Sequence, residues 1–177
     1  MVTTPPEPRF VVRSVGYTIV SVLLLFGALP LAAYAAGEVA RGRQAWPPAP
    51  TASPALAMLG LTLVVAGLTA YLSCAFWLMR NGRGPYIEFD PPTRLVATGP
   101  YRVVRNPVVL AVLLTMLGEA ILWGSVGIAL LLAVVVLVVQ YQVAAIEEPR
   151  LRKRFGDDYV AYCRRVPRWF PRGRPLK

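Results

Sequence analysis

Long apolar segments, separated by shorter charged ones, dominate the chain. Residues 14–37 and 44–79 carry no charged side chain, and residues 107–146 carry only Glu119. About 20 consecutive apolar residues are enough to cross a bilayer as a helix. The pattern therefore predicts an all-α integral membrane protein.

These segments divide into four transmembrane helices. The prolines between Trp46 and Pro50 cannot donate backbone hydrogen bonds, so the helix of the second segment begins after them. The last segment is too long for one pass, and Trp123-Gly124-Ser125 predicts a tight turn inside it. We expect spans at residues 14–37, 55–79, 107–123 and 126–146.

The first span has an alternative interpretation. Arg9 and Arg13, followed by an apolar run and Ala33-Tyr34-Ala35, also fit a signal peptide with its cleavage site. The apolar run is longer than the 7–15 residues usual in such peptides, which favours a retained span. Cleavage would leave the later topology unchanged.

Basic residues are distributed very unevenly between the two sides of these spans. Only Arg41 and Arg43, of 19 Lys and Arg, lie between the first and second spans. The positive-inside rule then places both termini and residues 80–106 in the cytoplasm, as expected for a plasma or inner membrane protein. The net charge of +10 predicts contact with anionic lipids of the bilayer. No nucleic-acid-binding motif accompanies it, so we expect no nucleic acid partner.

Composition excludes several classes of protein. The chain is 56% hydrophobic and 16% charged, against roughly 45–50% and about 25% in soluble domains. It has no histidine, which excludes His-based zinc sites, Ser-His-Asp triads and histidine general bases; we predict no metal site. Cys74 falls in a span and Cys163 on the cytoplasmic side, so no disulfide is expected.

The polar sequence is concentrated on both sides of the last two spans. Because these spans form a hairpin, residues 93–106 and 147–154 should meet at its cytoplasmic mouth. Gly82–Pro85, Asp90–Pro92 and Thr98–Tyr101 predict turns in the connecting loop. We expect any functional site at this mouth.

Several side chains there suit binding chemistry. Asn106-Pro107 predicts a helix start, with the Asn side chain as N-cap and Pro in the first turn. A helix N-terminus beside Arg102 and Arg105 is also suited to an anion. Glu147-Glu148, across the hairpin, can pair with nearby arginines or bind ribose hydroxyls or a cationic group.

The segment after the last span has helical periodicity. Charged residues separate its apolar positions, which predicts an interfacial amphipathic helix with the apolar side in lipid. Trp169 and Phe170 would anchor its end at the interface. The apolar positions are Leu151, Phe155, Tyr159, Tyr162 and Val166.

Glu119 is the charged residue within the third span. A carboxylate in a span is costly and marks a functional site or a structural requirement. It lies about 20 Å along the helix from Asn106, at 1.5 Å per residue. We therefore expect a packing role first and a role in a substrate tunnel second.

Ordered motifs in the second half of the chain resemble a known family. They are Pro91-Pro92, Leu95-Val96, Gly99-Pro100-Tyr101, Arg105-Asn106-Pro107, Glu147-Glu148-Pro149-Arg150-Leu151, Phe155-Gly156-Asp157-Asp158-Tyr159 and Val166-Pro167-Arg168-Trp169-Phe170-Pro171. Together they are similar to the isoprenylcysteine carboxyl methyltransferase family, which is related to the phospholipid methyltransferases. The resemblance divides the chain into generic spans, residues 1–80, and a methyltransferase core, residues 81–177.

The resemblance implies an S-adenosylmethionine-dependent methyltransferase that modifies a carboxylate, thiol or other nucleophile of an amphiphilic or lipid-like acceptor. Arg105 and Glu147 would be its catalytic residues. The cofactor-binding residues it implies are Leu95, Val96, Gly99, Tyr101, Arg105, Asn106, Glu147 and Glu148.

The chain departs from the family pattern at three positions. The family commonly has His where Asn106 stands, and Tyr and Gly where Val109 and Ala111 stand. Cofactor contacts from Val109 and Ala111 therefore do not carry over, and the acceptor is left open. Because an anionic acceptor needs no general base, the lack of histidine favours a carboxylate or thiol. Arg102 or Arg105 could orient it.

Two other functions stay open. A small four-span transporter would use Glu119 as its coupling carboxylate, but it would not need the ordered loop or the aromatic, basic tail. A non-catalytic membrane scaffold that keeps the fold is the third possibility. The methyltransferase hypothesis predicts that Glu147→Ala weakens cofactor binding strongly and Glu119→Ala little.

Overall fold

A computed structural model describes residues 8–42, 53–82 and 94–171. These residues are helical or irregular, with no strand among them. The elements are α1 (Pro8–Leu23), η1 (Leu24–Ala28), α2 (Leu29–Ala40), α3 (Pro54–Gly82), η2 (Gly99–Arg102), α4 (Pro107–Leu122), α5 (Val126–Tyr141), η3 (Gln142–Glu147) and α6 (Glu148–Arg165). The predictions for Trp46–Pro50 and for most of Gly82–Pro92 lie outside the described residues.

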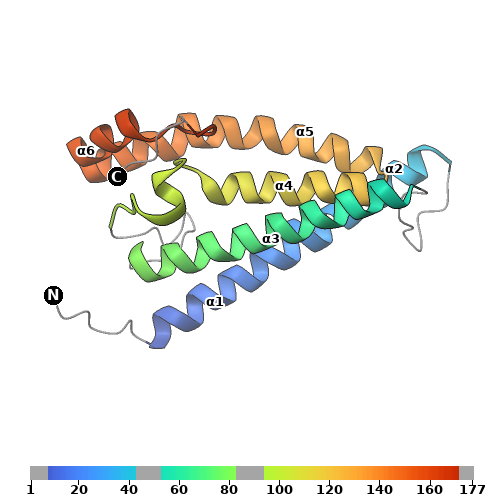
Figure 1. Ribbon diagram of the computed structural model, residues 1–177, viewed down its shortest axis with the longest axis horizontal. Coiled ribbons are helices and arrows are strands. Elements are labelled where there is room, and N and C mark those ends of the chain that lie inside the picture. Colours follow the sequence, from blue (N-terminus) through green and yellow to red (C-terminus); the bar gives the residue numbers. More distant parts are fainter. Residues whose placement is uncertain (1–7, 43–52, 83–93, 172–177) are drawn as a thin grey trace.

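Figure 1 shows long helices lying alongside one another, with α6 continuing α5 beyond the end of the bundle near η2. Three helices are long and apolar enough to cross a membrane: Ser14–Ala40, Pro54–Asn81 and Val126–Arg165. The shorter apolar helix α4 lies between α3 and α5, as expected for one arm of the hairpin. The predicted all-helical fold is confirmed, while a fourth span formed by α4 stays a prediction.

Glycines bring α3 and α4 together backbone to backbone. A Cβ on Gly67 would lie 2.7 Å from the amide nitrogen of Thr115, and one on Gly60 2.6 Å from that of Leu122. From the other side, a Cβ on Gly118 would lie 2.6 Å from the amide nitrogen of Val64. Small residues at such contacts are how membrane helices gain van der Waals packing without a hydrophobic driving force. The α3–α4 pair is therefore a tightly packed scaffold.

A tight turn joins α4 to α5, as predicted. Gly124 adopts a φ of +55°, a conformation that glycine reaches without steric cost. The buried side chain of Ser125 then accepts a hydrogen bond from the amide of Ile128 and caps α5. This turn returns the chain to the end of the bundle where η2 lies.

α5, η3 and α6 form one continuous helix, which Gly156 interrupts. Gly156 has φ 54° and ψ −130°, so the last turns of α6 take a different direction from the first. The stripe that includes Tyr159 and Tyr162 packs against Leu95 and Ala97 in the loop before α4. The prediction that this apolar side lies in lipid was wrong for Tyr159, Tyr162 and Val166, which are buried against another segment of the chain. The interfacial position of α6 stays a prediction.

Candidate functional site

The loop before α4 contains a turn at a glycine that packs against a tryptophan. Gly99 has a φ of +58°, and a Cβ there would lie 2.6 Å from the indole nitrogen of Trp77. That indole nitrogen donates a 3.3 Å hydrogen bond to the hydroxyl of Thr98. The predicted turn is confirmed as the helical turn η2, and it leaves Tyr101 buried on the inner side.

The start of α4 is only partly as predicted. Pro107 occupies the first turn and Asn106 stands at the N-cap position, but the Asn106 side chain accepts no capping hydrogen bond. It lines a pocket instead. The predicted capping role of the Asn106 side chain was therefore wrong, and the side chain is available to a ligand.

A hydrogen bond from a tyrosine joins the second part of α6 to the loop before α4. The Tyr162 hydroxyl donates a 2.6 Å hydrogen bond to the carbonyl oxygen of Tyr101. Burial raises the pKa of Tyr162 far above its ordinary value, although the nearby positive charge of Arg105 opposes the shift. Burial likewise raises the pKa of Tyr159, and Cys163 and Glu148 add to that shift. Both phenols therefore stay protonated at neutral pH.

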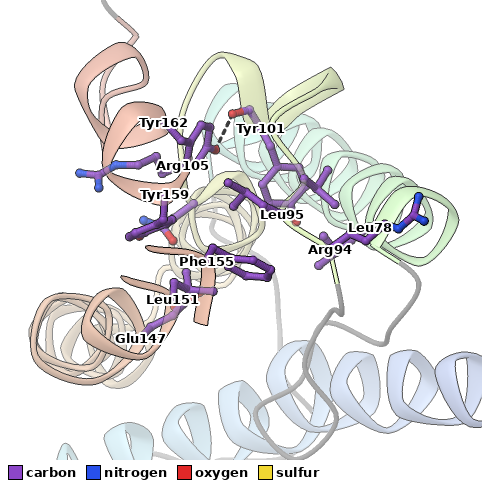
Figure 2. Close-up of a pocket in the computed structure, with 12 residues that line it drawn as sticks. Leu78, Arg94, Leu95, Tyr101, Arg105, Glu147, Leu151, Phe155, Tyr159 and Tyr162 are labelled. Atoms are coloured by element: carbon purple, nitrogen blue, oxygen red, sulfur yellow. Dashed lines mark hydrogen bonds between the residues drawn. The ribbon is translucent and has the colours of Figure 1, made fainter. Parts of the chain in front are cut away.

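A pocket of about 110 Å³ lies between this loop and α6 (Figure 2). Its walls are mostly apolar and aromatic, with a few charged or amide side chains among them. The lining residues are Leu78, Arg94, Leu95, Val96, Tyr101, Arg105, Asn106, Glu147, Leu151, Phe155, Tyr159 and Tyr162. The prediction that residues 93–106 and 147–154 meet is thus confirmed for the described part of these segments.

The structure brings six of the eight predicted site residues to this pocket. They are Leu95, Val96, Tyr101, Arg105, Asn106 and Glu147. Gly99 forms the turn that packs against Trp77, and Glu148 does not line the pocket but forms an ion pair with Arg105, which does. Sequence reasoning missed the other six pocket residues, although helical spacing had marked the last four of them as one face of a helix. They are Leu78, Arg94, Leu151, Phe155, Tyr159 and Tyr162.

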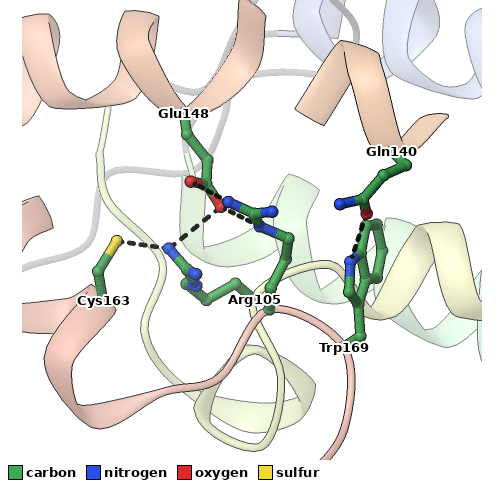
Figure 3. Close-up of polar contacts among 6 residues, drawn as sticks. Arg105, Gln140, Glu148, Cys163 and Trp169 are labelled. Atoms are coloured by element: carbon green, nitrogen blue, oxygen red, sulfur yellow. Dashed lines mark hydrogen bonds and ion pairs between the residues drawn. The ribbon is translucent and has the colours of Figure 1, made fainter. Parts of the chain in front are cut away.

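An ion cluster joins three segments around the pocket residue Arg105 (Figure 3). Arg105 Nη1 lies 3.2 Å from Glu148 Oε1 and 2.6 Å from Cys163 Sγ. Arg168 donates two 2.7 Å hydrogen bonds, from Nε and Nη2, to the two oxygens of Glu148. These bonds raise the pKa of Arg168 above its already high ordinary value. The predicted pairing of an acid with a loop arginine is confirmed for Glu148 and Arg105, and Arg168 was not foreseen.

Arg105 still has one donor that the described residues leave unused. Its Nε atom is buried and has no hydrogen-bond partner there. Because an unsatisfied buried donor costs free energy, such an atom indicates a place for a ligand or water oxygen. Arg105 thus both lines the pocket and keeps a donor free.

The other candidate residues lie away from the pocket. Glu119, Val109 and Ala111 do not line it, and Ala111 packs in the core against Tyr71. Glu119 is 7% exposed, and its Oε2 atom finds no partner among the described residues. In the described ranges, no three His, Cys, Asp or Glu side chains are grouped so that they could hold a metal ion.

Comparison with known proteins places the chain in a family. The sequence model of the family described as phospholipid methyltransferase matches residues 55–158, more than half of the chain. The chain belongs to the phospholipid methyltransferase family. The match runs from α3 into α6 and includes every pocket residue except Tyr159 and Tyr162. Together with the apolar helices, membership of this family identifies an integral membrane protein.

Two curated relatives are similar to part of the chain. The nickel-cobalt-cadmium resistance protein NccN of Alcaligenes xylosoxydans is 30% identical over 115 residues, which cover 65% of this chain and 48% of the relative. The cobalt-zinc-cadmium resistance protein CzcN of Cupriavidus metallidurans is 30% identical over 120 residues, 68% of this chain and 51% of the relative. The chain thus spans about half the length of these relatives. No solved structure matches it significantly.

Proposed function

We propose that the chain is an S-adenosylmethionine-dependent methyltransferase that binds its cofactor at the pocket between the loop and α6. The observation that carries this proposal is the convergence of the two segments on one pocket, inside the region that matches a methyltransferase family. The apolar walls near Leu95 and Phe155 suit an adenosyl group. The Glu147 carboxylate suits ribose hydroxyls or a cationic group, and the unused Arg105 Nε suits a carboxylate.

The chemistry at this site is a displacement at carbon. When bound, S-adenosylmethionine would supply a methyl group open to displacement by a lone pair of the nucleophile, with the electron pair of the broken carbon–sulfur bond remaining on sulfur. The protein's contribution is to align the two reactants and to exclude water. Leu151 and Phe155 in the pocket wall serve the second purpose.

The pocket favours an acceptor that is already anionic. An ammonium acceptor must lose a proton before it can react, and the tyrosines in the wall cannot take it at neutral pH, because burial raises their pKa values and keeps them protonated. Glu147 is the carboxylate that lines the pocket, and we assign it the task of contacting the cofactor. A carboxylate or thiolate on an amphiphilic or lipid-like molecule needs no base, so we propose this acceptor class.

The charge on α6 supports the proposed orientation in the membrane. Arg152, Lys153 and Arg154 are exposed, as is the large apolar side chain of Phe170. Exposed basic residues beside a span suit the anionic lipids of a cytoplasmic leaflet. We therefore propose that the pocket opens on the cytoplasmic side.

Binding of S-adenosylhomocysteine, the demethylated product, tests the proposal. Isothermal titration of the detergent-purified wild type should give a one-site curve. Glu147→Ala should weaken the affinity about tenfold or more, because the carboxylate that lines the pocket is lost. Glu119→Ala, a matched loss of a carboxylate outside the pocket, should change it less than twofold.

Two outcomes would contradict this function. A folded wild type that gives no heat would exclude the methyltransferase. A stronger effect of Glu119→Ala than of Glu147→Ala would favour the transporter in which Glu119 couples transport. If binding is found, radiolabelled methyl transfer into membrane extracts, followed by lipid separation, identifies the acceptor.

A further inference from the structure

A short segment after α6 connects three parts of the molecule. The chain leaves the helix at Val166, whose side chain is 1% exposed and whose backbone is extended, with φ −114° and ψ 122°. We call Val166–Trp169 the C-terminal clasp. The buried side chain of Val166 fixes the position of this segment, from which the three following residues contact other elements.

Each of the next three residues of the C-terminal clasp bonds to a different element. The Pro167 carbonyl accepts a 2.9 Å hydrogen bond from the backbone amide of Arg105, in the loop. The Arg168 guanidinium makes its two bonds to Glu148, at the start of α6. The Trp169 indole donates a 2.8 Å hydrogen bond to the side chain of Gln140, in α5 (Figure 3).

The C-terminal clasp holds Arg105 in two ways. It binds the backbone of Arg105 directly through Pro167, and it binds the guanidinium indirectly, because Arg168 orients the carboxylate that Arg105 meets. A bidentate arginine–carboxylate pair fixes the plane of the carboxylate as well as its position. Without Arg168, the carboxylate of Glu148 could turn away from Arg105.

We propose that Arg168 is a positioning residue for the cofactor pocket. It does not line the pocket, but through Glu148 it sets the guanidinium of Arg105 in the pocket wall. This inference rests on the proposed function, since it assumes that the pocket takes the cofactor. Like the pocket residues Tyr159 and Tyr162, Arg168 lies beyond the family match, which ends at residue 158.

A double-mutant cycle read by S-adenosylhomocysteine affinity tests the proposal. Arg168→Ala should weaken binding about fivefold to tenfold, and Arg168→Lys, which keeps the charge but not the bidentate geometry, should weaken it less. Arg105→Ala should weaken binding at least as much as Arg168→Ala. In the Arg105→Ala protein, adding Arg168→Ala should change the affinity less than twofold, because the residue that it positions is gone.

Matched controls separate positioning from general stability. Arg164→Ala removes an exposed arginine of α6 and should leave the affinity within twofold of the wild type. Thermal unfolding of each variant reports whether it folds, and Arg168→Lys supplies the test if Arg168→Ala does not fold. Unchanged affinity in both folded Arg168 variants, or full additivity in the double variant, would overturn the proposal. A folded wild type without binding would overturn the proposed function itself.

Discussion

The α3–α4 interface and the pocket end are held together by different forces. Along α3 and α4, Gly60, Gly67 and Gly118 allow the two backbones to touch, and packing provides the contact. At the pocket end, hydrogen bonds and ion pairs such as Tyr162 to Tyr101 and Arg168 to Glu148 join segments far apart in sequence.

The difference matches the task of each region. Close packing of small residues has a single favourable geometry and resists change. Directional polar contacts instead place particular side chains at particular points, and their strength depends on protonation and on water. The bundle therefore provides the scaffold, and the polar end determines what the pocket presents.

The largest expected effect is on the scaffold. Gly67→Ala would place a methyl group 2.7 Å from the amide nitrogen of Thr115, which has no room to move within α4. Overpacking of this kind costs about 1–3 kcal/mol. The thermal unfolding temperature in detergent should fall by several degrees, as measured by intrinsic fluorescence.

The same substitution at an open position is the control. A Cβ on Gly16 has no neighbour within 4 Å, so Gly16→Ala should leave the unfolding temperature unchanged or raise it slightly, since alanine favours helix. Equal effects at Gly16 and Gly67 would show that the α3–α4 contact is not as close as described.

A smaller effect is expected where polar contacts hold the pocket. Tyr162→Phe removes the hydroxyl that reaches the Tyr101 carbonyl and leaves that buried acceptor without this donor, at a cost of about 1–2 kcal/mol. Affinity for S-adenosylhomocysteine should fall a few fold in titration. Tyr141→Phe, at a position 68% exposed, should change neither stability nor affinity.

The smallest expected effect at neutral pH is the contribution of two buried tyrosines to the free energy of unfolding, which changes only at alkaline pH. Tyr159 and Tyr162 have pKa values raised above the ordinary value of about 10, so above pH 10 the unfolded chain loses protons that the folded chain keeps. The contribution of these two tyrosines to the free energy of unfolding is therefore constant below that pH and decreases as the pH rises further.

Unfolding midpoints measured from pH 7 to 11 check this direction. Replacing both tyrosines with phenylalanine should make the alkaline loss of stability shallower than in the wild type. A double variant with the wild-type slope would contradict the assignment, because other groups would then cause the loss.

Much of this organisation could be predicted from local sequence. Apolar length predicts the long helices, and the Trp123-Gly124-Ser125 turn follows from glycine and a capping serine. The convergence of the loop with residues after 146 follows from hairpin geometry alone. The individual site residues came from the family resemblance, and six of those eight line one pocket.

What could not be predicted depends on contacts between distant segments. An apolar stripe indicates that Tyr159 and Tyr162 avoid water, but it does not distinguish burial in lipid from burial against protein, which is what the structure shows. Asparagine before proline favours a cap, yet the Asn106 side chain lines the pocket. The pairing of Glu148 with Arg168, 20 residues later, requires the chain to leave its helix at Val166.

The π-helical segment η3 determines the direction in which the side chains of α6 point around the helix axis. A π turn holds one residue more than an α turn, and each residue of a helix turns the chain by about 100°. Because η3 holds that extra residue, deleting one of the alanines at 144 or 145 would rewind Gln142–Glu147 as α-helix and leave Leu151 and Phe155 near their present direction around the axis of α5. Deleting a residue within α5 itself would instead rotate them by about 100°. A single-residue deletion within α5 would thus displace one wall of the pocket without removing any residue in it, whereas one within η3 would leave that wall in place.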